Sequence, residues 1–221
     1  MNLAANDVAQ YLKDHPDFFN QYAELLAQLS IPDPHGGRAI SITERQIIGL
    51  REQVKKLEGK LAELLRFGEE NDVLSAKTHR LAVGLARAGD ATSVLLALYA
   101  HLGGGFAIPH VAVRLWDVPH DPAALESQPV SAAVKDYVQN LQHPYCGAVG
   151  GIDAAEWFGE DGQNVRSLAI VPLRDEGATF GFLALGSEEA ERFYPGMGTL
   201  YLERIGELAS AALMRTCAID G

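Results

Sequence analysis

The stretch His143–Gly147, with the sequence His-Pro-Tyr-Cys-Gly, holds the residues of this chain whose types most readily do chemistry. Cys146 could act as a thiol nucleophile or redox group if His143 lowered its pKa, because the thiolate is the reactive form. A lone cysteine inside a domain is also a small hydrophobic residue, and His-Pro is typical of a loop. The only other cysteine, Cys217, stands in the C-terminal tail, so a resolving partner is in doubt. We favour the structural role and keep a thiol-dependent enzyme as the alternative.

Metal and nucleotide sites need residue spacings that this sequence lacks. The candidate metal ligands stand far apart along the chain, at His101, His110, His143 and Cys146. They show neither the i, i+4 spacing of ligands on a helix nor a CxxC pair. The glycine-rich stretches 103–105 and 147–151 match neither GxGxxG nor a phosphate-binding loop. The sequence therefore predicts no metal site, and it leaves the cofactor unknown.

The elements around these residues have the pattern of an α+β domain. Asp90 can cap a helix that ends at three glycines. The inward residues of this helix are Val94, Leu95, Leu98 and Leu102. Residues 111–116 alternate between apolar and polar side chains, as a strand does, and a short helix is expected around Val138. Residues 200–214 form a closing helix, whose apolar stripe is Tyr201, Ile205, Leu208 and Ala212.

Two apolar runs in this domain, residues 165–173 and 179–185, predict a β-hairpin. Gly177 lies between them and can supply the positive φ of a tight turn. Both runs are too apolar for a sheet with one solvated face. We therefore expect both faces of the sheet to be covered.

The clearest periodic signal lies between residues 41 and 66. Ser41 and Glu44 form the capping box that is typical of a helix start. Apolar residues then recur at spacings of 3, 4, 3, 4 and 3, which is an a/d heptad seam made of Ile47, Leu50, Val54, Leu57, Leu61 and Leu64. So narrow a stripe needs a partner helix. We favour a parallel coiled coil between two copies of the chain, and the rival is an amphipathic helix that packs on its own domain.

The N-terminal residues 6–29 predict two short helices separated at Pro16, and residues 31–37 predict a loop. The aromatic residues Phe18, Phe19 and Tyr22 either close a small core against the long helix, which we favour, or form a docking surface for a protein.

The predicted organisation has three parts. Residues 1–40 form a helical pair and loop, residues 41–88 form a long helix with a dimerising seam, and residues 89–221 form the α+β domain.

Several stretches together resemble one bacterial family. They are His15–Phe19, Ile31–Pro32, Ser41–Arg51, Arg166–Leu173, Gly186–Ser187, Arg192–Leu200 and Gly206–Leu208. This is the GAF-like family of unknown function called domain of unknown function four hundred and eighty-four, and the resemblance covers nearly the whole chain. It implies a GAF-like domain with an antiparallel central sheet and no agreed activity. Some GAF-like enzymes reduce methionine sulfoxide with several cysteines, which is the activity that the alternative for Cys146 would take.

The resemblance also implies a ligand pocket between the sheet and the variable insertion. Arg114 and Trp116 alternate away from the core residues of their strand, and an arginine there could hold a carboxylate or phosphate. The rival interpretation is that Arg166 and Arg192 pair with nearby acids and organise loops. The candidate ligand-binding residues are therefore Arg114, Trp116, Cys146, Arg166, Ser167, Ser187 and Arg192.

The composition restricts the partners. The chain has 18 Lys and Arg against 29 Asp and Glu, a net charge of −11, which disfavours direct binding of nucleic acid. No apolar run approaches the roughly 20 residues that cross a bilayer, and the N-terminus does not resemble a signal peptide. We expect a cytoplasmic, non-enzymatic regulatory or adaptor protein that is a homodimer. A small molecule or a partner protein would act on the arrangement of its domains, as in signalling.

Overall fold

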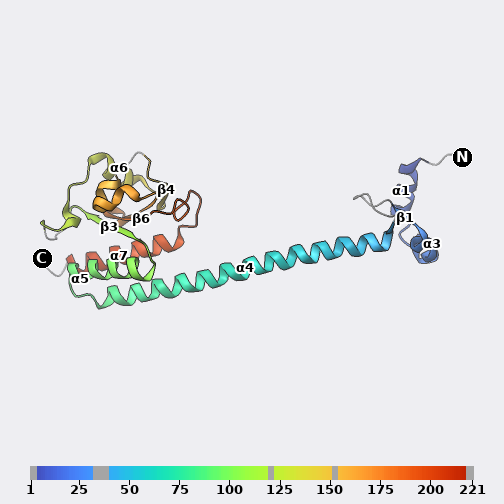
Figure 1. Cartoon of the computed structure of the whole chain (residues 1–221), viewed down its shortest axis with the longest axis horizontal. Coiled ribbons are helices and arrows are strands. Elements are labelled where there is room, and N and C mark those ends of the chain that lie inside the picture. Colours follow the sequence, from blue (N-terminus) through green and yellow to red (C-terminus); the bar gives the residue numbers. More distant parts are fainter. Residues whose placement is uncertain (1–3, 32–39, 119–121, 151–153, 218–221) are drawn as a thin grey trace. The chain divides into compact units, whose positions relative to one another are not determined.

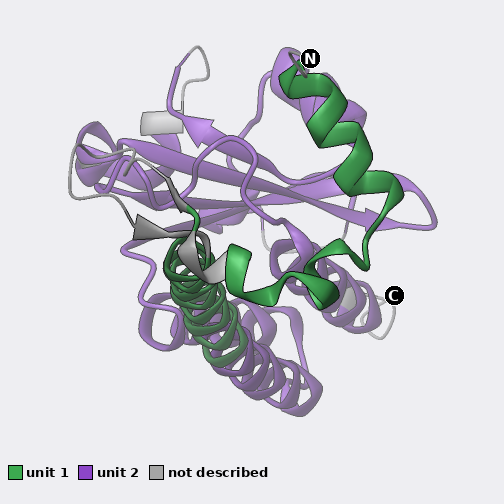
Figure 2. Cartoon of the chain, turned by 90° about the vertical axis from the view of Figure 1, so that its right-hand side faces the viewer, with its two compact units in different colours: residues 1–69 green, residues 70–221 purple. Residues whose placement is uncertain are grey.

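The computed structural model describes residues 4–31, 40–118, 122–150 and 154–217. The chain divides into two compact units, residues 1–69 and 70–221 (Figure 2). Helix α4 (Ile42–Arg87) passes the boundary, so each unit holds one part of it. No helix within these ranges has the length and apolarity to span a membrane.

The N-terminal part of the first unit contains three helices where the sequence predicted two. They are α1 (Ala5–Asp14), α2 (Phe18–Gln21) and α3 (Ala23–Gln28). The second predicted helix breaks at Tyr22, whose backbone is not helical (φ −123°, ψ 48°). Two short strands, β1 (Ser30–Ile31) and β2 (Ile40–Ser41), pair antiparallel and were not predicted. Most of the predicted loop, residues 32–37, lies outside the described residues.

The aromatic side chains of this region contact one another. The Phe18 ring lies 4.9 Å from the Tyr22 ring and 5.3 Å from the Phe19 ring, measured between centroids. Phe18 and Phe19 are half-buried, whereas Tyr22 is 53% exposed. These rings form a small partly exposed cluster rather than a closed core.

The predicted long helix is present as α4, a single helix of 46 residues. It continues through Gly49, Gly59 and Gly68, where a Cβ would have no neighbour within 4 Å. The predicted capping box involves the Ser41 side chain, which lies outside the described residues.

The second unit is built on a four-stranded antiparallel sheet with the order β3-β6-β5-β4. Its strands are β3 (His110–Leu115), β4 (Tyr145–Ala148), β5 (Ser167–Asp175) and β6 (Ala178–Ser187). The predicted hairpin is confirmed as β5–β6. Its turn consists of Glu176 and Gly177, both with positive φ (46° and 90°), as a two-residue hairpin turn requires. Strand β4 was missed because its sequence was interpreted as a loop.

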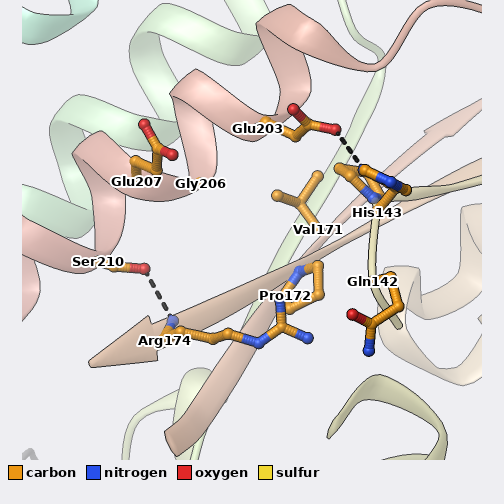
Figure 3. A pocket seen from close by; sticks show the side chains of 10 residues that line it. Gln142, His143, Val171, Pro172, Arg174, Glu203, Gly206, Glu207 and Ser210 are labelled. Atoms are coloured by element: carbon orange, nitrogen blue, oxygen red, sulfur yellow. Dashed lines mark hydrogen bonds and ion pairs between the residues drawn. The ribbon is translucent and has the colours of Figure 1, made fainter. Parts of the chain in front are cut away.

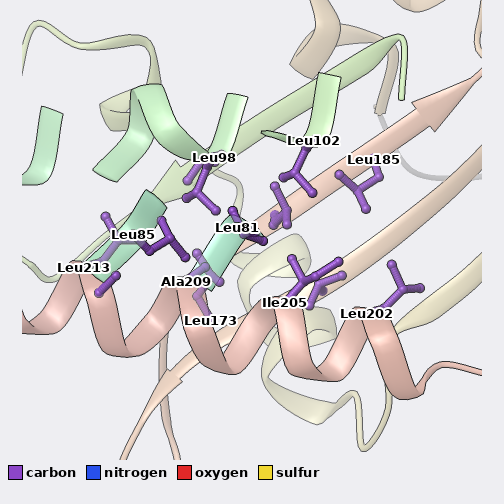
Figure 4. Packing of buried hydrophobic residues seen from close by; sticks show 14 of the residues in the cluster. Leu81, Leu85, Leu98, Leu102, Leu173, Leu185, Leu202, Ile205, Ala209 and Leu213 are labelled. Carbon is purple, nitrogen blue, oxygen red and sulfur yellow. The ribbon is translucent and has the colours of Figure 1, made fainter. Parts of the chain in front are cut away.

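Helices cover both faces of the sheet, as the apolar runs predicted (Figure 1). On one face lie the end of α4, α5 (Ala91–Tyr99), the π-helix η1 (Ala100–Gly105) and α7 (Leu200–Cys217). Figure 4 shows this core, in which Leu81, Leu98, Leu102, Leu173, Leu185 and Ile205 meet. On the other face lie α6 (Ala132–Asn140) and the 3-10 segments η2 (Leu125–Ser127) and η3 (Ala154–Asn164).

Two local predictions need correction. The Asp90 cap is confirmed, because its carboxylate accepts from the Ser93 N–H at 2.7 Å. The three glycines, however, form a π-helix without positive φ, and the left-handed residue is Ala107 (φ 53°). In α7 the buried stripe also differs from the prediction, since it consists of Leu202, Ile205, Ala209, Ala212 and Leu213, with Tyr201 and Leu208 only half-buried.

Candidate functional site

A cavity of about 340 Å³ lies between strand β3 and the segments that cover its second face. We call it the Arg114 cavity. Its principal lining residues are Tyr99, Arg114, Glu126, Gln128, Trp157 and Phe158. As predicted, Arg114 and Trp116 face away from Val113 and Leu115, which belong to the core on the α7 side. The alternation of β3 therefore presents an arginine to the segments η2 and η3.

Arg114 is a buried charge, with 5% of its surface exposed. Its Nη1 donates to the carbonyl of Val113 at 2.8 Å. Its Nη2 donates at 3.3 Å to the Gln128 side-chain oxygen and at 3.3 Å to the Trp157 carbonyl. Burial lowers the pKa of Arg114, although a guanidinium still stays protonated at neutral pH. All three acceptors are neutral, so these bonds orient the guanidinium without neutralising it.

Glu126 and Tyr99 form the second polar feature of this cavity. The Tyr99 hydroxyl donates to Glu126 Oε1 at 2.6 Å, and Glu126 is 9% exposed. Burial raises the pKa of Tyr99, and the bond to Glu126 raises it further. The phenol therefore keeps its proton and holds the carboxylate in a fixed position.

Trp116 lies beside this cavity rather than in it. Its indole N–H donates to the Thr179 carbonyl at 2.9 Å, and the Lys135 ammonium lies 5.1 Å from its ring. Trp116 lines a neighbouring hollow of about 370 Å³. Gln128 lines both spaces, so the two predicted residues belong to adjacent sites.

Four other candidate residues lie away from the Arg114 cavity, and three of them, Ser167, Ser187 and Arg192, organise the connection that follows β6. Ser167 donates to the Glu189 carbonyl at 2.6 Å, and Ser187 accepts from the Glu189 N–H at 3.1 Å. Arg192 donates to the Phe106 carbonyl at 2.8 Å. The Arg166 side chain is exposed. The loop-organising interpretation thus fits Arg192, although its partners are main-chain carbonyls rather than the acids we expected.

Cys146 lies in β4 and packs against the core on the α7 side, whereas the Arg114 cavity lies on the opposite face. Burial raises the pKa of the Cys146 thiol to about 11. His143 is not among the causes of this shift, and its Nδ1 forms a hydrogen bond with Glu203 Oε1 at 3.0 Å. This environment favours a neutral thiol over a nucleophilic thiolate.

A separate groove of about 380 Å³ lies between α7 and the end of β5 (Figure 3). Four of its polar residues form two pairs: His143 bonds Glu203, and the Arg174 N–H donates to Ser210 Oγ at 3.0 Å. The Arg174 guanidinium donates to main-chain carbonyls at the end of α6, including that of Leu141. These contacts connect α6, β5 and α7, so we interpret the groove as a packing feature.

The histidines also stand in separate environments. His101 packs against Gly84, and His110 Nε2 is buried without a hydrogen-bond partner, 3.8 Å from Glu188. Within the described ranges, no three His, Cys, Asp or Glu side chains gather closely enough to hold a metal ion.

Sequence reasoning missed Tyr99, Glu126 and Trp157. Tyr99 follows an apolar helix face and was not singled out. Glu126 and Trp157 come from short 3-10 segments of the insertion, where no periodic pattern indicates which side chains point inward.

The sheet, its two helical layers and the cavity on the insertion side define an α+β domain that follows a long helix. The chain belongs to the family described as "Protein of unknown function, DUF484", which it matches over residues 1–216. A relative that the chain resembles is the "Uncharacterized protein YigA" of Salmonella typhimurium. It is 23% identical over 216 residues, which cover 94% of this chain and 90% of the relative.

Two solved structures illustrate what the fold is similar to. One is the native GAF domain of the potassium sensor histidine kinase KdpD from Escherichia coli, with 16% identity and a TM-score of 0.43, covering 66% of this chain and 96% of that domain. The other is free methionine-R-sulfoxide reductase from Neisseria meningitidis in complex with its substrate. It has 17% identity and a TM-score of 0.46, and the match covers 66% of this chain and 91% of the reductase chain. Neither likeness assigns an activity to this chain.

Proposed function

We propose that this protein is a homodimeric regulatory or adaptor module. In this proposal a helical stalk joins two GAF-like domains, and each domain binds a small ligand in the Arg114 cavity. Binding would act on the arrangement of the two domains through α4, which runs from the stalk into the domain.

The observation that carries the proposal is the exposure of the heptad seam on α4. Its six apolar side chains leave between 44% (Ile47) and 65% (Leu64) of their surface exposed. Burial of one such side chain contributes about 1.5–3 kcal/mol of favourable free energy, so association that buries the exposed seam would be strongly favourable. A second copy of the chain offers an identical and therefore complementary stripe.

The residue types on the seam favour two parallel helices. Isoleucine and valine occupy the first two a positions, Ile47 and Val54, and leucine occupies every d position. Branched side chains at a with leucine at d favour parallel dimers in coiled coils. Residues 41–66 also carry six Lys or Arg and four Glu, so the helices approach each other without strong repulsion, while acidic residues predominate in the rest of the chain.

We favour binding over catalysis because the strongest candidate nucleophile is poorly suited to react. Burial keeps the Cys146 thiol protonated at neutral pH, and no charge of His143 contributes to its pKa. The Arg114 cavity instead presents fixed polar groups, which is what a binding site requires.

Light scattering on the intact protein tests the dimer. We expect a dimer at micromolar concentration, and the double variant Leu50→Lys, Leu57→Lys is expected to weaken association on the order of a thousandfold, because four leucines per dimer are lost. A monomeric wild-type protein would sink the proposal.

A matched control places the same charges away from the seam. Gly49→Lys with Ala62→Lys adds two lysines at outward positions of the same helix and should leave the dimer intact. Equal dissociation of both double variants would mean that charge, not the seam, controls association.

A further inference from the structure

Two buried side chains of opposite charge line the Arg114 cavity without pairing with each other. Arg114 is 5% exposed and Glu126 is 9% exposed. No salt bridge joins Arg114 to Glu126 among the described residues. Burial lowers the pKa of Arg114, and the nearby charge of Glu126 acts in the opposite direction without a direct contact. Buried charges are costly unless they are neutralised, so a ligand group of opposite charge in direct contact with each side chain would offset its burial further.

The guanidinium of Arg114 can accept an additional anionic partner. Two of its three bonds are long, at 3.3 Å, and one of these goes to Gln128, whose side chain is exposed. The amide oxygen of Gln128 is therefore readily displaced. A carboxylate would replace a weak neutral acceptor with a charge-assisted, bidentate one.

Glu126 can bind a cation in the same cavity. Tyr99 occupies one of its oxygens through the 2.6 Å bond. The second oxygen retains acceptor capacity, because a carboxylate accepts several hydrogen bonds. Glu156 also lines this cavity with an exposed side chain, which adds negative charge at its rim.

The remaining wall is apolar and aromatic. Trp157 and Phe158 line the cavity, and the Trp157 ring is held 4.5 Å from the Phe182 ring, measured between centroids. This wall fits the hydrocarbon or aromatic part of a small molecule.

From these contacts we infer that the Arg114 cavity binds a zwitterionic small molecule of the α-amino acid class. Its carboxylate binds Arg114, its ammonium group binds Glu126, and its side chain lies against Trp157 and Phe158. This inference rests on the ligand-binding part of the proposed function and names the ligand class.

The test uses tryptophan fluorescence of the full-length protein. The chain has two tryptophans, so Trp116→Phe leaves Trp157, in the wall of the cavity, as the only reporter. The probes are the proteinogenic L-amino acids. For each one that binds, the analogues are the amine without the carboxylate and the acid without the ammonium group. We expect at least one amino acid to bind, and each analogue to bind at least about tenfold more weakly.

Substitutions assign the two charges separately. Arg114→Gln should weaken binding of the amino acid about tenfold or more and leave binding of the amine analogue unchanged. Glu126→Gln should also weaken binding of the amino acid about tenfold or more, and it should leave binding of the acid analogue unchanged. Arg192→Gln, an arginine outside the cavity, is the matched control and should change nothing. Because the analogues alter the ligand rather than the protein, they remain informative if a variant fails to fold.

The outcomes separate this inference from the proposed function. If an amine or an acid alone binds as tightly as the amino acid, the inference of a zwitterionic ligand is wrong, whereas the proposal that this cavity binds a ligand is supported. If no amino acid changes the fluorescence at about 10 mM, the inference is also overturned. Light scattering on the same samples reports the dimer independently of either result.

Discussion

The arginines of this protein are distinguished by what they contact rather than by their sequence neighbours. Arg174, Arg192 and Arg215 all donate to main-chain carbonyls, and Arg215 does so at the end of α4, with the Ala88 carbonyl at 2.7 Å. Such bonds satisfy carbonyls that a helix end or loop leaves without partners. Arg114 also donates to two main-chain carbonyls, and it differs from the other three because it is buried in the wall of a cavity.

At the residue scale, the environment of Cys146 predicts low reactivity. In a Cys217→Ala variant, which leaves Cys146 as the only cysteine, alkylation by iodoacetamide should be slow at neutral pH. Its rate should rise with an inflection near pH 11, because burial raises the pKa from the ordinary 9.0 to about 11. An inflection below pH 8.5 would contradict the structural role and revive the thiol-dependent alternative.

The same shift has a consequence for stability. Between the ordinary thiol pKa and about pH 11 the unfolded chain releases the proton while the folded chain retains it. Ionisation of Cys146 therefore leaves the free energy of unfolding unchanged below the ordinary pKa and lowers it as the pH rises through this range.

At the scale of elements, Gly206 allows α7 to lie close to β5. A Cβ at this position would lie 2.6 Å from Cγ1 of Val171, which is 1% exposed and β-branched. The stiff, buried valine has little room to move aside. The approach of helix to strand therefore depends on the missing side chain.

The substitution Gly206→Ala should lower the free energy of unfolding by about 1–3 kcal/mol, because overpacking outweighs the gain in helix propensity. Urea unfolding followed by circular dichroism measures this change. Gly59→Ala is the matched control. Nothing lies within 4 Å of a Cβ at this position, so the substitution should stabilise the helix by about 1 kcal/mol through its higher helix propensity. A Gly206→Ala protein as stable as the wild type would show that α7 can shift without cost.

How far the elements could be predicted depended on how periodic they are. The strand β3 and the helix α4 each carry a repeating pattern that specifies their type, and the hairpin β5–β6 consists of two apolar runs on either side of a turn glycine. Strand β4 and the segments η2 and η3 do not, because short edge and insertion segments are held by contacts with distant residues. The buried stripe of α7 was predicted only in part for a related reason: Ile205 and Ala212 are buried as predicted, but the facing strand decides which other residues of the helix are buried.

At the scale of the whole molecule, the proposed coiled coil has a direction that can be measured. In a parallel pair the two copies of Leu64, at one end of the seam, face each other. In an antiparallel pair they lie at opposite ends, roughly 25 Å apart for helices of this rise per residue. The orientation decides whether the two domains lie together and can influence each other.

Disulfide formation distinguishes the two orientations. In a background with Cys146→Ala and Cys217→Ala, Leu64→Cys should form a covalent dimer under mild oxidation, seen on a non-reducing gel, because facing d positions lie within disulfide distance. Glu63→Cys, on the outward face of the same turn, is the control and should remain reduced. A dimer by light scattering that fails to cross-link at Leu64→Cys would contradict the parallel arrangement.

The sequence by itself determined the α+β class, the hairpin, the long helix with its apolar seam and the family, because these depend on local residue patterns and short sequence motifs. It also placed Arg114 on the second face of the sheet, since alternation along a strand is a local property. Only the tertiary structure decided that Glu126, Tyr99 and Trp157 join Arg114 around one cavity, and that the Cys146 thiol lies on the opposite face. The physical reason is that burial, the proximity of charges and the pKa of a thiol arise from contacts between segments far apart in the chain.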